Sequence, residues 1–289
     1  MRFASCSRQA LVHERTHGPD VTGYAKDVLV EPEWLECHLH DESIRVLEVD
    51  EDPGVYERVH IPGAIGLDWR RDLQDPVRRR FLAPEQFGRL LGGRGVSPEH
   101  LVVLYGDRNN WFAAYGYWYL KYYGHRAVKL LNGPRELWIS HGRPTSVTIP
   151  EHPPCTYRAG GGDPDIRITR DGVLGALDGG HVFVDVRAPM EFSGTQSSGR
   201  SCGAAGPQRA GHIPGACSIP WALAVNEDGS FKSANELREL YGNQGVLCGD
   251  PVITYCSIGE RSAHTWFVLH ELLGLPVVKN YDGSWSGGT

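Results

Sequence analysis

An internal repeat restricts the possible folds of this chain more than any other sequence feature. Residues 59–64 (VHIPGA) return almost unchanged as residues 211–216 (GHIPGA), and a tryptophan follows each copy at the same distance. From Phe81 onward the offset between matching residues changes from 152 to 150, which pairs Tyr105 with Tyr255. Two copies at so long a period predict a duplicated globular domain and not a solenoid. A length of 289 residues has room for both domains.

Each copy alternates apolar strand-like segments with helix-like segments. In the second copy, residues 182–186 and 251–255 are apolar runs typical of buried strands, residues 234–241 predict a helix, and a further apolar helix ends at Gly274. Residues 277–278 predict a last short strand. This order predicts an α/β fold in which each domain is a mostly parallel sheet flanked by helices. The aromatic run at residues 111–123 predicts a helix buried between the domains.

Proline and glycine mark the boundary between the two copies. Residues 144–164 contain five prolines and the triplet Gly160-Gly161-Gly162, a composition typical of a linker. We therefore expect an N-terminal tail at residues 1–24, a first domain at 25–145, a linker at 146–166 and a second domain at 167–289. The tail carries no matching motif, and we expect it to be disordered.

Composition excludes several classes of protein. The net charge of -6 argues against a general nucleic-acid binder, and no apolar stretch approaches the roughly 20 residues that span a bilayer. The first residues lack the apolar run of a secretory signal, so we expect a cytoplasmic protein. Seven scattered cysteines without a CxxC pair favour reduced thiols over disulfides or a zinc site. Cys37, His38 and His40 lie close together without further ligands, and we expect no metal there.

Cys256 has the sequence surroundings of a reactive thiol. It stands where an apolar strand ends and an amphipathic helix is about to begin. The backbone N–H groups of such a loop and the dipole of the following helix favour a thiolate over a thiol. Gly259 allows backbone angles that a side chain would resist, and Arg261 adds a full positive charge for an anionic substrate.

The first copy serves as an internal control for these assignments. The repeat sets Gly106 opposite Cys256, Trp111 opposite Arg261 and Asp50 opposite Arg187. The chemistry-bearing residues are therefore absent from the first copy, which keeps the His-Ile-Pro-Gly-Ala turn. We interpret His60 and His212 of this turn as structural.

Four motifs together resemble a known family. Residues 185–187 (DVR), 211–216 (GHIPGA), 256–261 (CSIGER) and 280–285 (NYDGSW) are similar, in this order, to tandem-domain rhodaneses, the thiosulfate sulfurtransferases, most of all to the bacterial, actinobacterial-type members. The resemblance covers about residues 25–285. It implies an inactive first and a catalytic second rhodanese domain, and in the family the chain continues past the last of these motifs.

The resemblance also implies a mechanism and roles for individual residues. Cys256 would form a persulfide as the catalytic nucleophile, Arg187 and Arg261 would contact the substrate anion, and Ser257, Ile258, Gly259 and Glu260 would form the active-site loop. No metal and no organic cofactor is implied. The activity is that of a thiosulfate:cyanide sulfurtransferase (EC 2.8.1.1), which moves the outer sulfur of thiosulfate to cyanide or a thiol acceptor.

Several alternatives stay open at this point. Ser257 follows the cysteine where vertebrate relatives carry other residues, so 3-mercaptopyruvate is a second candidate donor, and a persulfide carrier fed by a partner enzyme in sulfur assimilation is a third possibility. A phosphatase is disfavoured, because four residues separate Cys256 from Arg261 where phosphatase loops have five. His264 and His270 are weak candidates for a general base. Nothing indicates an oligomeric state.

Overall fold

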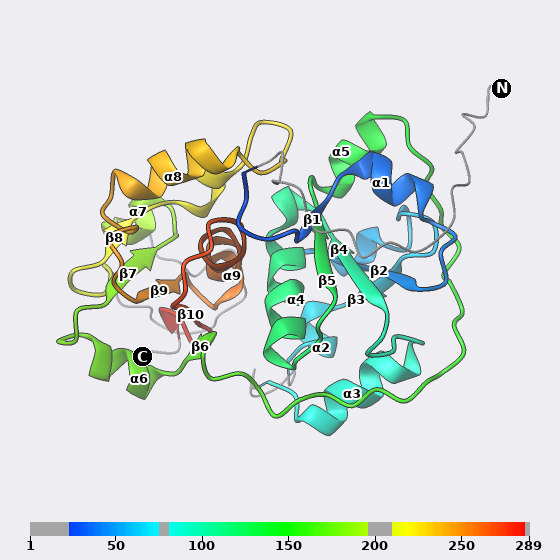
Figure 1. Cartoon of the computed structure of the whole chain (residues 1–289), viewed down its shortest axis with the longest axis horizontal. Coiled ribbons are helices and arrows are strands. Elements are labelled where there is room, and N and C mark those ends of the chain that lie inside the picture. The colour runs from blue at the N-terminus through cyan, green and yellow to red at the C-terminus, as the bar shows by residue number, and fades with distance from the viewer. Residues whose placement is uncertain (1–22, 75–80, 196–209, 287–289) are drawn as a thin grey trace.

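The computed structural model describes residues 23–74, 81–195 and 210–286, which form two α/β domains of the same topology side by side (Figure 1). Disorder is predicted for residues 1–24, and residues 1–22 lie outside the described part of the chain. Gly23 and Tyr24 are described. The side-chain hydroxyl of Tyr24 donates a hydrogen bond to the carbonyl of Lys232 at 2.8 Å.

The first sheet has five strands in the order β1-β5-β4-β2-β3, and every neighbouring pair is parallel. The two central strands are largely buried; β4 is made of apolar residues and tyrosine, whereas β2 also contains Arg45 and Glu48. The elements are β1 (Leu29–Val30), α1 (Pro32–Cys37), β2 (Ile44–Val49), η1 (Pro53–Val55), β3 (Ile65–Leu67), α2 (Trp69–Asp72), α3 (Pro84–Gly93), β4 (Leu101–Tyr105), η2 (Arg108–Asn110), α4 (Trp111–Tyr122), β5 (Val128–Leu131) and α5 (Arg135–Ser140).

The second sheet repeats this order as β6-β10-β9-β7-β8, again with parallel pairs throughout. The predicted fold class is therefore confirmed for both domains. The elements are β6 (Arg167–Ile168), α6 (Arg170–Ala176), β7 (Val182–Asp185), α7 (Pro189–Phe192), β8 (Cys217–Ser218), η4 (Trp221–Ala224), α8 (Ala234–Gly242), β9 (Val252–Tyr255), α9 (Glu260–Trp266), the π-helical turn η5 (Phe267–Leu272) and β10 (Val278–Tyr281). The last strand is longer than the two residues predicted from the sequence.

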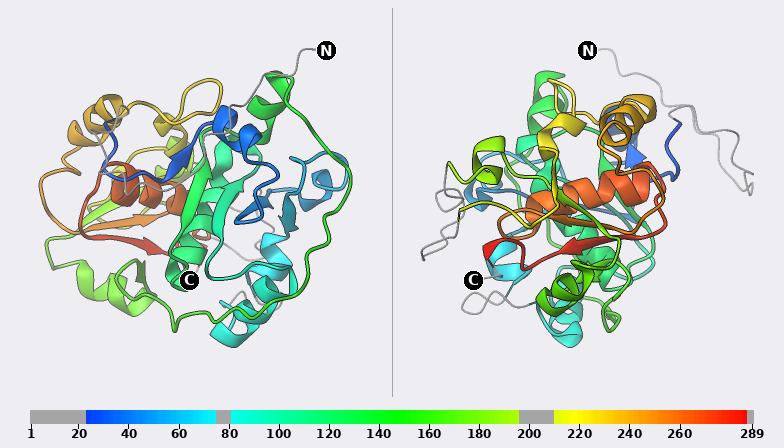
Figure 2. Two further views of the ribbon diagram at one scale, coloured as in Figure 1. Left: turned by 45° about the vertical axis from the view of Figure 1, so that its right-hand side comes forward. Right: turned by 90° about the vertical axis from the view of Figure 1, so that its left-hand side faces the viewer.

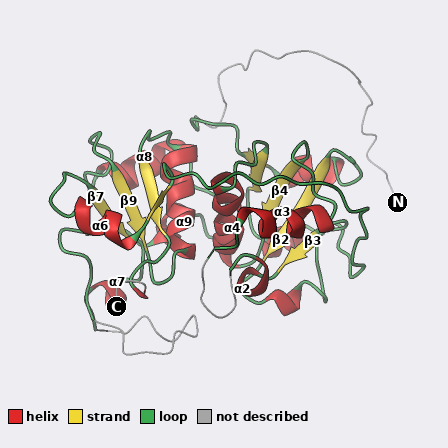
Figure 3. Cartoon of the chain, turned by 90° about the horizontal axis from the view of Figure 1, so that it is seen from below, coloured by secondary structure: helices red, strands yellow, loops and turns green. Residues whose placement is uncertain are grey.

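Two helices form the contact between the domains. α4 lies against α9 in the middle of the molecule, as the view of Figure 3 also shows. The ring of Tyr117 meets that of Phe267 edge-on at a centroid distance of 4.8 Å, and Trp111 lies 5.3 Å from Trp221. One hydrophobic core therefore continues from the first domain into the second. The predicted burial of the aromatic helix is confirmed.

The linker is attached to the first domain. It follows the outer side of that domain (Figure 2, left). Backbone hydrogen bonds hold it there, from Cys155 N–H to the Gly92 carbonyl at 2.9 Å and from Gly160 N–H to the Tyr123 carbonyl at 2.8 Å. The segment before β1 contacts the second domain, where the N–H of Ala25 donates to the carbonyl of Leu272 at 2.8 Å. The linker is thus held on the first domain, and the segment before β1 is held on the second.

The repeated turn has a structural role in both copies. In the first, Nδ1 of His60 lies 2.7 Å from the carbonyl oxygen of Tyr56, and its Nε2 lies 3.0 Å from that of Thr148. In the second, Nδ1 of His212 lies 2.9 Å from the carbonyl oxygen of Phe192. These contacts agree with the structural interpretation of the two histidines.

The described part of the chain contains no helix both long and apolar enough to cross a bilayer. The described cysteines form no disulfide; they are Cys37, Cys155, Cys217, Cys248 and Cys256. Cys6 and Cys202 lie outside the described residues.

Candidate active site

Cys256 lies at the carboxyl edge of the second sheet, directly after β9. Its side chain is fully buried, and α9 begins only four residues later, at Glu260. The short turn between them depends on Gly259, whose φ of +104° is in the left-handed region. A Cβ at this position would lie 2.7 Å from the carbonyl oxygen of Asp282. The predicted requirement for glycine therefore has a steric cause as well as a conformational one.

Three hydrogen-bond donors surround the sulfur of Cys256. The N–H of Gly259 points at Sγ from 3.1 Å, and the hydroxyl oxygens of Ser262 and Ser284 lie 3.7 Å and 3.9 Å from it. The N–H of Gly259 can therefore hydrogen-bond a negative charge on the sulfur. Neither serine was singled out in the sequence.

The turn after β10 supports the loop that carries Cys256. Ser284 has a φ of +46°, and its hydroxyl accepts a hydrogen bond from Cys256 N–H at 3.0 Å. The next two backbone N–H groups, of Trp285 and Ser286, donate to the carbonyls of Cys256 and Ser257 at 3.1 Å and 2.9 Å. The NYDGSW motif thus holds the cysteine loop in place, a role that the sequence pattern alone does not indicate.

Arg261 is held by a carboxylate. Its two terminal nitrogens donate to the oxygens of Glu191 at 2.9 Å and 3.0 Å, and one of them also donates to the Ser257 hydroxyl at 2.7 Å. Burial tends to raise the pKa of Glu191, but the hydrogen bonds and the charge of Arg261 outweigh it and lower this pKa to about 2. Glu191 is therefore ionised at neutral pH and offsets much of the charge of Arg261.

Glu191 was missed in the sequence. A local signal for its position exists, since it stands three residues after Ala188 and its carboxylate accepts the Ala188 N–H at 3.0 Å, with proline in the first turn of α7. This pattern predicts a helix start. It gives no indication of the arginine 70 residues further along the chain.

Arg187 is paired in a similar way. Its guanidinium donates to the carboxylate of Asp185 from Nε at 2.9 Å and from Nη2 at 2.6 Å, and Nη2 also donates to the Gly211 carbonyl at 2.8 Å. Burial alone would lower the pKa of Arg187, but the hydrogen bonds and charge of Asp185 raise it above its ordinary value. The Trp285 ring lies 5.0 Å from the guanidinium carbon. Arg187 is 1% exposed.

The remaining loop residues and the two histidines lie around this centre. Ile258 packs against the core and Glu260 is buried at the start of α9. His264 is fully buried, its ring stacks on Phe231 at 5.0 Å, and burial lowers its pKa to about 3. His270 lies at the domain contact beside Glu271, 2.9 Å away. His264 and His270 thus contact Phe231 and Glu271, respectively.

The family is decided by comparison with known proteins. The sequence pattern described as "Rhodanese-like domain" matches residues 31–141 and 169–289 of this chain. The chain belongs to the rhodanese-like family. The predicted tandem-domain resemblance is thereby confirmed, with one match on each repeat.

Relatives match this chain over most of their own length. The "Sulfur carrier protein TtuD" of Thermus thermophilus is 50% identical over 269 residues, which cover 91% of this chain and 94% of the relative. The "Putative thiosulfate sulfurtransferase 1" of Mycobacterium bovis is 52% identical over 260 residues, covering 90% and 94%. Among solved structures, SseA of Escherichia coli, a 3-mercaptopyruvate sulfotransferase, superposes with a TM-score of 0.74 at 26% identity and covers 89% of this chain and 98% of its own.

The first rhodanese-like domain has a different residue set at the equivalent loop. Gly106, which aligns with Cys256, donates its N–H to the side-chain oxygen of Asn110 at 2.8 Å. The Asn110 amide in turn donates to the carbonyls of Leu131 and Gly133 at 2.8 Å and 2.9 Å. The N–H of Gly106 thus bonds a side chain of its own loop, whereas the equivalent N–H of Cys256 bonds Ser284 from the turn after β10.

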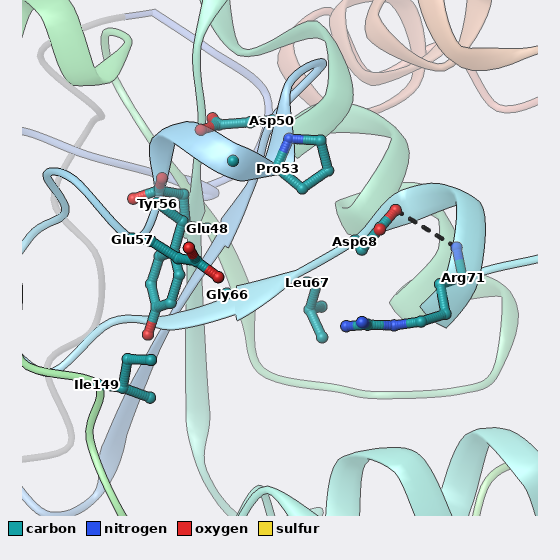
Figure 4. A pocket seen from close by; sticks show the side chains of 11 residues that line it. Glu48, Asp50, Pro53, Tyr56, Glu57, Gly66, Leu67, Asp68, Arg71 and Ile149 are labelled. Atoms are coloured by element: carbon teal, nitrogen blue, oxygen red, sulfur yellow. Dashed lines mark hydrogen bonds between the residues drawn. The ribbon is translucent and has the colours of Figure 1, made fainter.

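The charges of the first domain are also rearranged. Asp50, which aligns with Arg187, pairs with Arg135, which lies opposite Trp285 in the repeat; Arg135 also donates to Glu48 at 2.7 Å. Burial and the charge of Glu48 raise the pKa of Asp50 to about 8, although Arg135 opposes this. Both carboxylates line a cavity of about 350 Å³ (Figure 4). At the position of Arg187 the first domain therefore has a carboxyl group with its own arginine partner.

The residues around His38 form no comparable centre. Nδ1 of His38 lies 2.7 Å from the carbonyl oxygen of Trp34, on whose ring the imidazole stacks. Across residues 23–74, 81–195 and 210–286, no three histidine, cysteine or acidic side chains cluster in a way that could hold a metal ion.

Proposed function

We propose that this protein is a sulfurtransferase that takes the outer sulfur of thiosulfate onto Cys256. The thiolate attacks that sulfur, a new S–S bond forms, and the S–S bond of thiosulfate breaks with its electron pair on sulfite. Cys256 is left as a persulfide. Cyanide or a thiolate then attacks the outer sulfur, and thiocyanate or the acceptor's persulfide leaves as the Cys256 thiolate returns. The cycle needs no redox partner and no cofactor.

The observation that carries this proposal is the donor set around Sγ of Cys256. The Gly259 N–H at 3.1 Å is fixed by the turn and is available without rearrangement when negative charge grows on the sulfur. Every species of the cycle, the thiolate, the persulfide and the departing sulfite, is anionic. Membership in the rhodanese-like family and the names of the relatives support the same reaction class.

We propose that Arg261 and Arg187 supply the positive charge for the donor. Each is held by a carboxylate, so its guanidinium is already oriented before substrate binds. The paired carboxylates also weaken the net positive charge at the site. This favours recognition of the sulfur donor by hydrogen bonds over recognition by charge alone. In this proposal the active-site loop consists of Ser257, Ile258, Gly259 and Glu260.

The experiment that tests the proposal is intact-mass analysis of the full chain. After incubation with thiosulfate, the wild-type protein is expected to gain one sulfur atom, which cyanide removes as thiocyanate. Cys256→Ser is expected to gain none. A sulfur gain in the Cys256→Ser variant would overturn the assignment of the nucleophile.

Two alternative donors are separated by the same measurement. The structural likeness to SseA favours a parallel incubation with 3-mercaptopyruvate, and a gain only in that arm would replace thiosulfate as the donor. The identity to the Thermus sulfur carrier favours a partner-fed role. No gain with either small molecule, but a gain after incubation with a cysteine desulfurase, would support the carrier role.

The proposal assigns the two halves of the chain different tasks. The second domain, residues 167–289, carries the chemistry, the linker spans residues 146–166, and the first domain, residues 25–145, is non-catalytic because a glycine stands at position 106. We place the protein in the cytoplasm, where reduced thiols persist. Its partners are a small sulfur donor and a thiophilic acceptor, with no nucleic acid and no membrane.

A further inference from the structure

Ser262 lies in the first turn of α9, one helical turn beyond the cysteine loop, and is fully buried. Its hydroxyl oxygen has two possible acceptors. The carbonyl oxygen of Gly259 is 3.1 Å away and the sulfur of Cys256 is 3.7 Å away. A hydroxyl has one proton, so it serves only one of these at a time.

The carbonyl of Gly259 does not depend on Ser262. It also accepts the side-chain amide of Asn280 at 3.1 Å and the backbone N–H of Ala263 at 3.3 Å. If the hydroxyl of Ser262 turns away, this buried carbonyl keeps two donors and is not left unsatisfied. The rotation therefore costs little on the carbonyl side.

The other hydroxyl near the sulfur lacks this freedom. Ser284 donates its proton to the carbonyl of Tyr281 at 2.7 Å while its oxygen accepts the N–H of Cys256. Turning the Ser284 proton toward the sulfur, 3.9 Å away, would give up the shorter of these bonds. Of the two serine hydroxyls that contact the sulfur in the described chain, Ser262 is thus the one that can change its acceptor cheaply.

We propose that Ser262 is a catalytic residue whose hydroxyl turns from the Gly259 carbonyl to the sulfur of Cys256 whenever that sulfur is anionic. This inference rests on the proposed thiolate chemistry. The switch breaks and forms only hydrogen bonds. It stabilises the attacking thiolate, and it acts again when Cys256 leaves as a thiolate from the persulfide, so both half-reactions gain from it.

The test is the pH dependence of Cys256 alkylation by iodoacetamide, followed on the peptide that contains this cysteine. In Ser262→Ala, the midpoint of the profile is expected to move up by about one pH unit, and discharge of the persulfide by cyanide to slow roughly 10-fold, the usual effect of one hydrogen bond to a charged group. Ser262→Thr keeps a hydroxyl and is expected to restore most of both.

Thr254→Val is the matched control. It removes another buried hydroxyl, which bonds the Ser262 carbonyl at 3.1 Å, and the midpoint is expected to stay at the wild-type value. An unchanged midpoint in a folded Ser262→Ala variant, or an equal shift in Thr254→Val, would overturn the inference. A wild-type protein that accepts no sulfur from any donor would instead overturn the proposed function, because the alkylation profile needs no donor.

Discussion

Both arginines that the sequence assigned to the substrate are paired with buried or nearly buried carboxylates. Arg261 has Glu191 and Arg187 has Asp185, so each position is a neutral pair and not an isolated cation. Removing one member of such a pair leaves the other charge poorly solvated, which costs more than the pair contributes. The carboxylates are therefore as important to the loop as the arginines.

Glu191→Gln is expected to destabilise the protein by about 2 kcal/mol at pH 7. Because the folded-state pKa of Glu191 is lowered to about 2, its contribution is fully present above the ordinary pKa of 4.5 and is lost as the pH falls toward 2. Urea unfolding at pH 7 and pH 3 measures this difference. A gap between wild type and variant that does not shrink at pH 3 would contradict the ion pair.

The opposite sign is expected for Asp50. Its folded-state pKa is raised to about 8, so the stability that its protonated form provides is complete below pH 3.8 and is lost as the pH rises through 8. Asp50→Asn should therefore gain stability over wild type between pH 4 and pH 9, with Glu48 still paired to Arg135. Thermal unfolding of both proteins at pH 4 and pH 9 checks this. An equal difference in Tm between variant and wild type at the two pH values would rule out the titration of Asp50.

The two loops that follow β4 and β9 differ in more than the cysteine. In the first domain, a Cβ at Gly106 would lie 2.1 Å from the carbonyl oxygen of Val49, and the side chain of Asn110 accepts the N–H of Gly106. The loop has thus closed around a glycine. Restoring the missing side chain alone cannot rebuild the site, because there is no space for its Cβ.

Gly106→Cys in a Cys256→Ser background is accordingly expected to take up no sulfur from thiosulfate and to be destabilised by about 2–4 kcal/mol through overpacking. Intact mass and urea unfolding give the two readings. Persulfide formation at position 106 would show that the first loop keeps a usable cradle.

The repeat allowed much of this arrangement to be predicted. An offset of 150 aligned Tyr105 with Tyr255, and these two residues end β4 and β9. The position of Cys256 between strand and helix followed from the apolar pattern. The carboxylate partners did not, because Glu191 reaches Arg261 only through the fold. The same holds for Ser262 and Ser284, whose hydroxyls approach the sulfur from separate elements.

The two domains share one core across α4 and α9, so they are expected to unfold together. Tyr117 is fully buried against Phe267 at this contact. Tyr117→Ala should destabilise the whole chain by about 3–5 kcal/mol, as other large-to-small changes of buried aromatic residues do. Calorimetry should show a single transition for wild type and variant. Two separate transitions in the wild-type protein would contradict a common core.

The helices at this contact are the same element in each copy. α4, Trp111–Tyr122, corresponds through the offset of 150 to residues 261–272, which are α9 and η5. A surface that meets its own equivalent is the geometry of a twofold-symmetric homodimer. The tandem chain thus has the form of a fused pair of single-domain ancestors. In this pair the second half carries Cys256, and the first half packs its aromatic helix α4 against the helix that follows that cysteine.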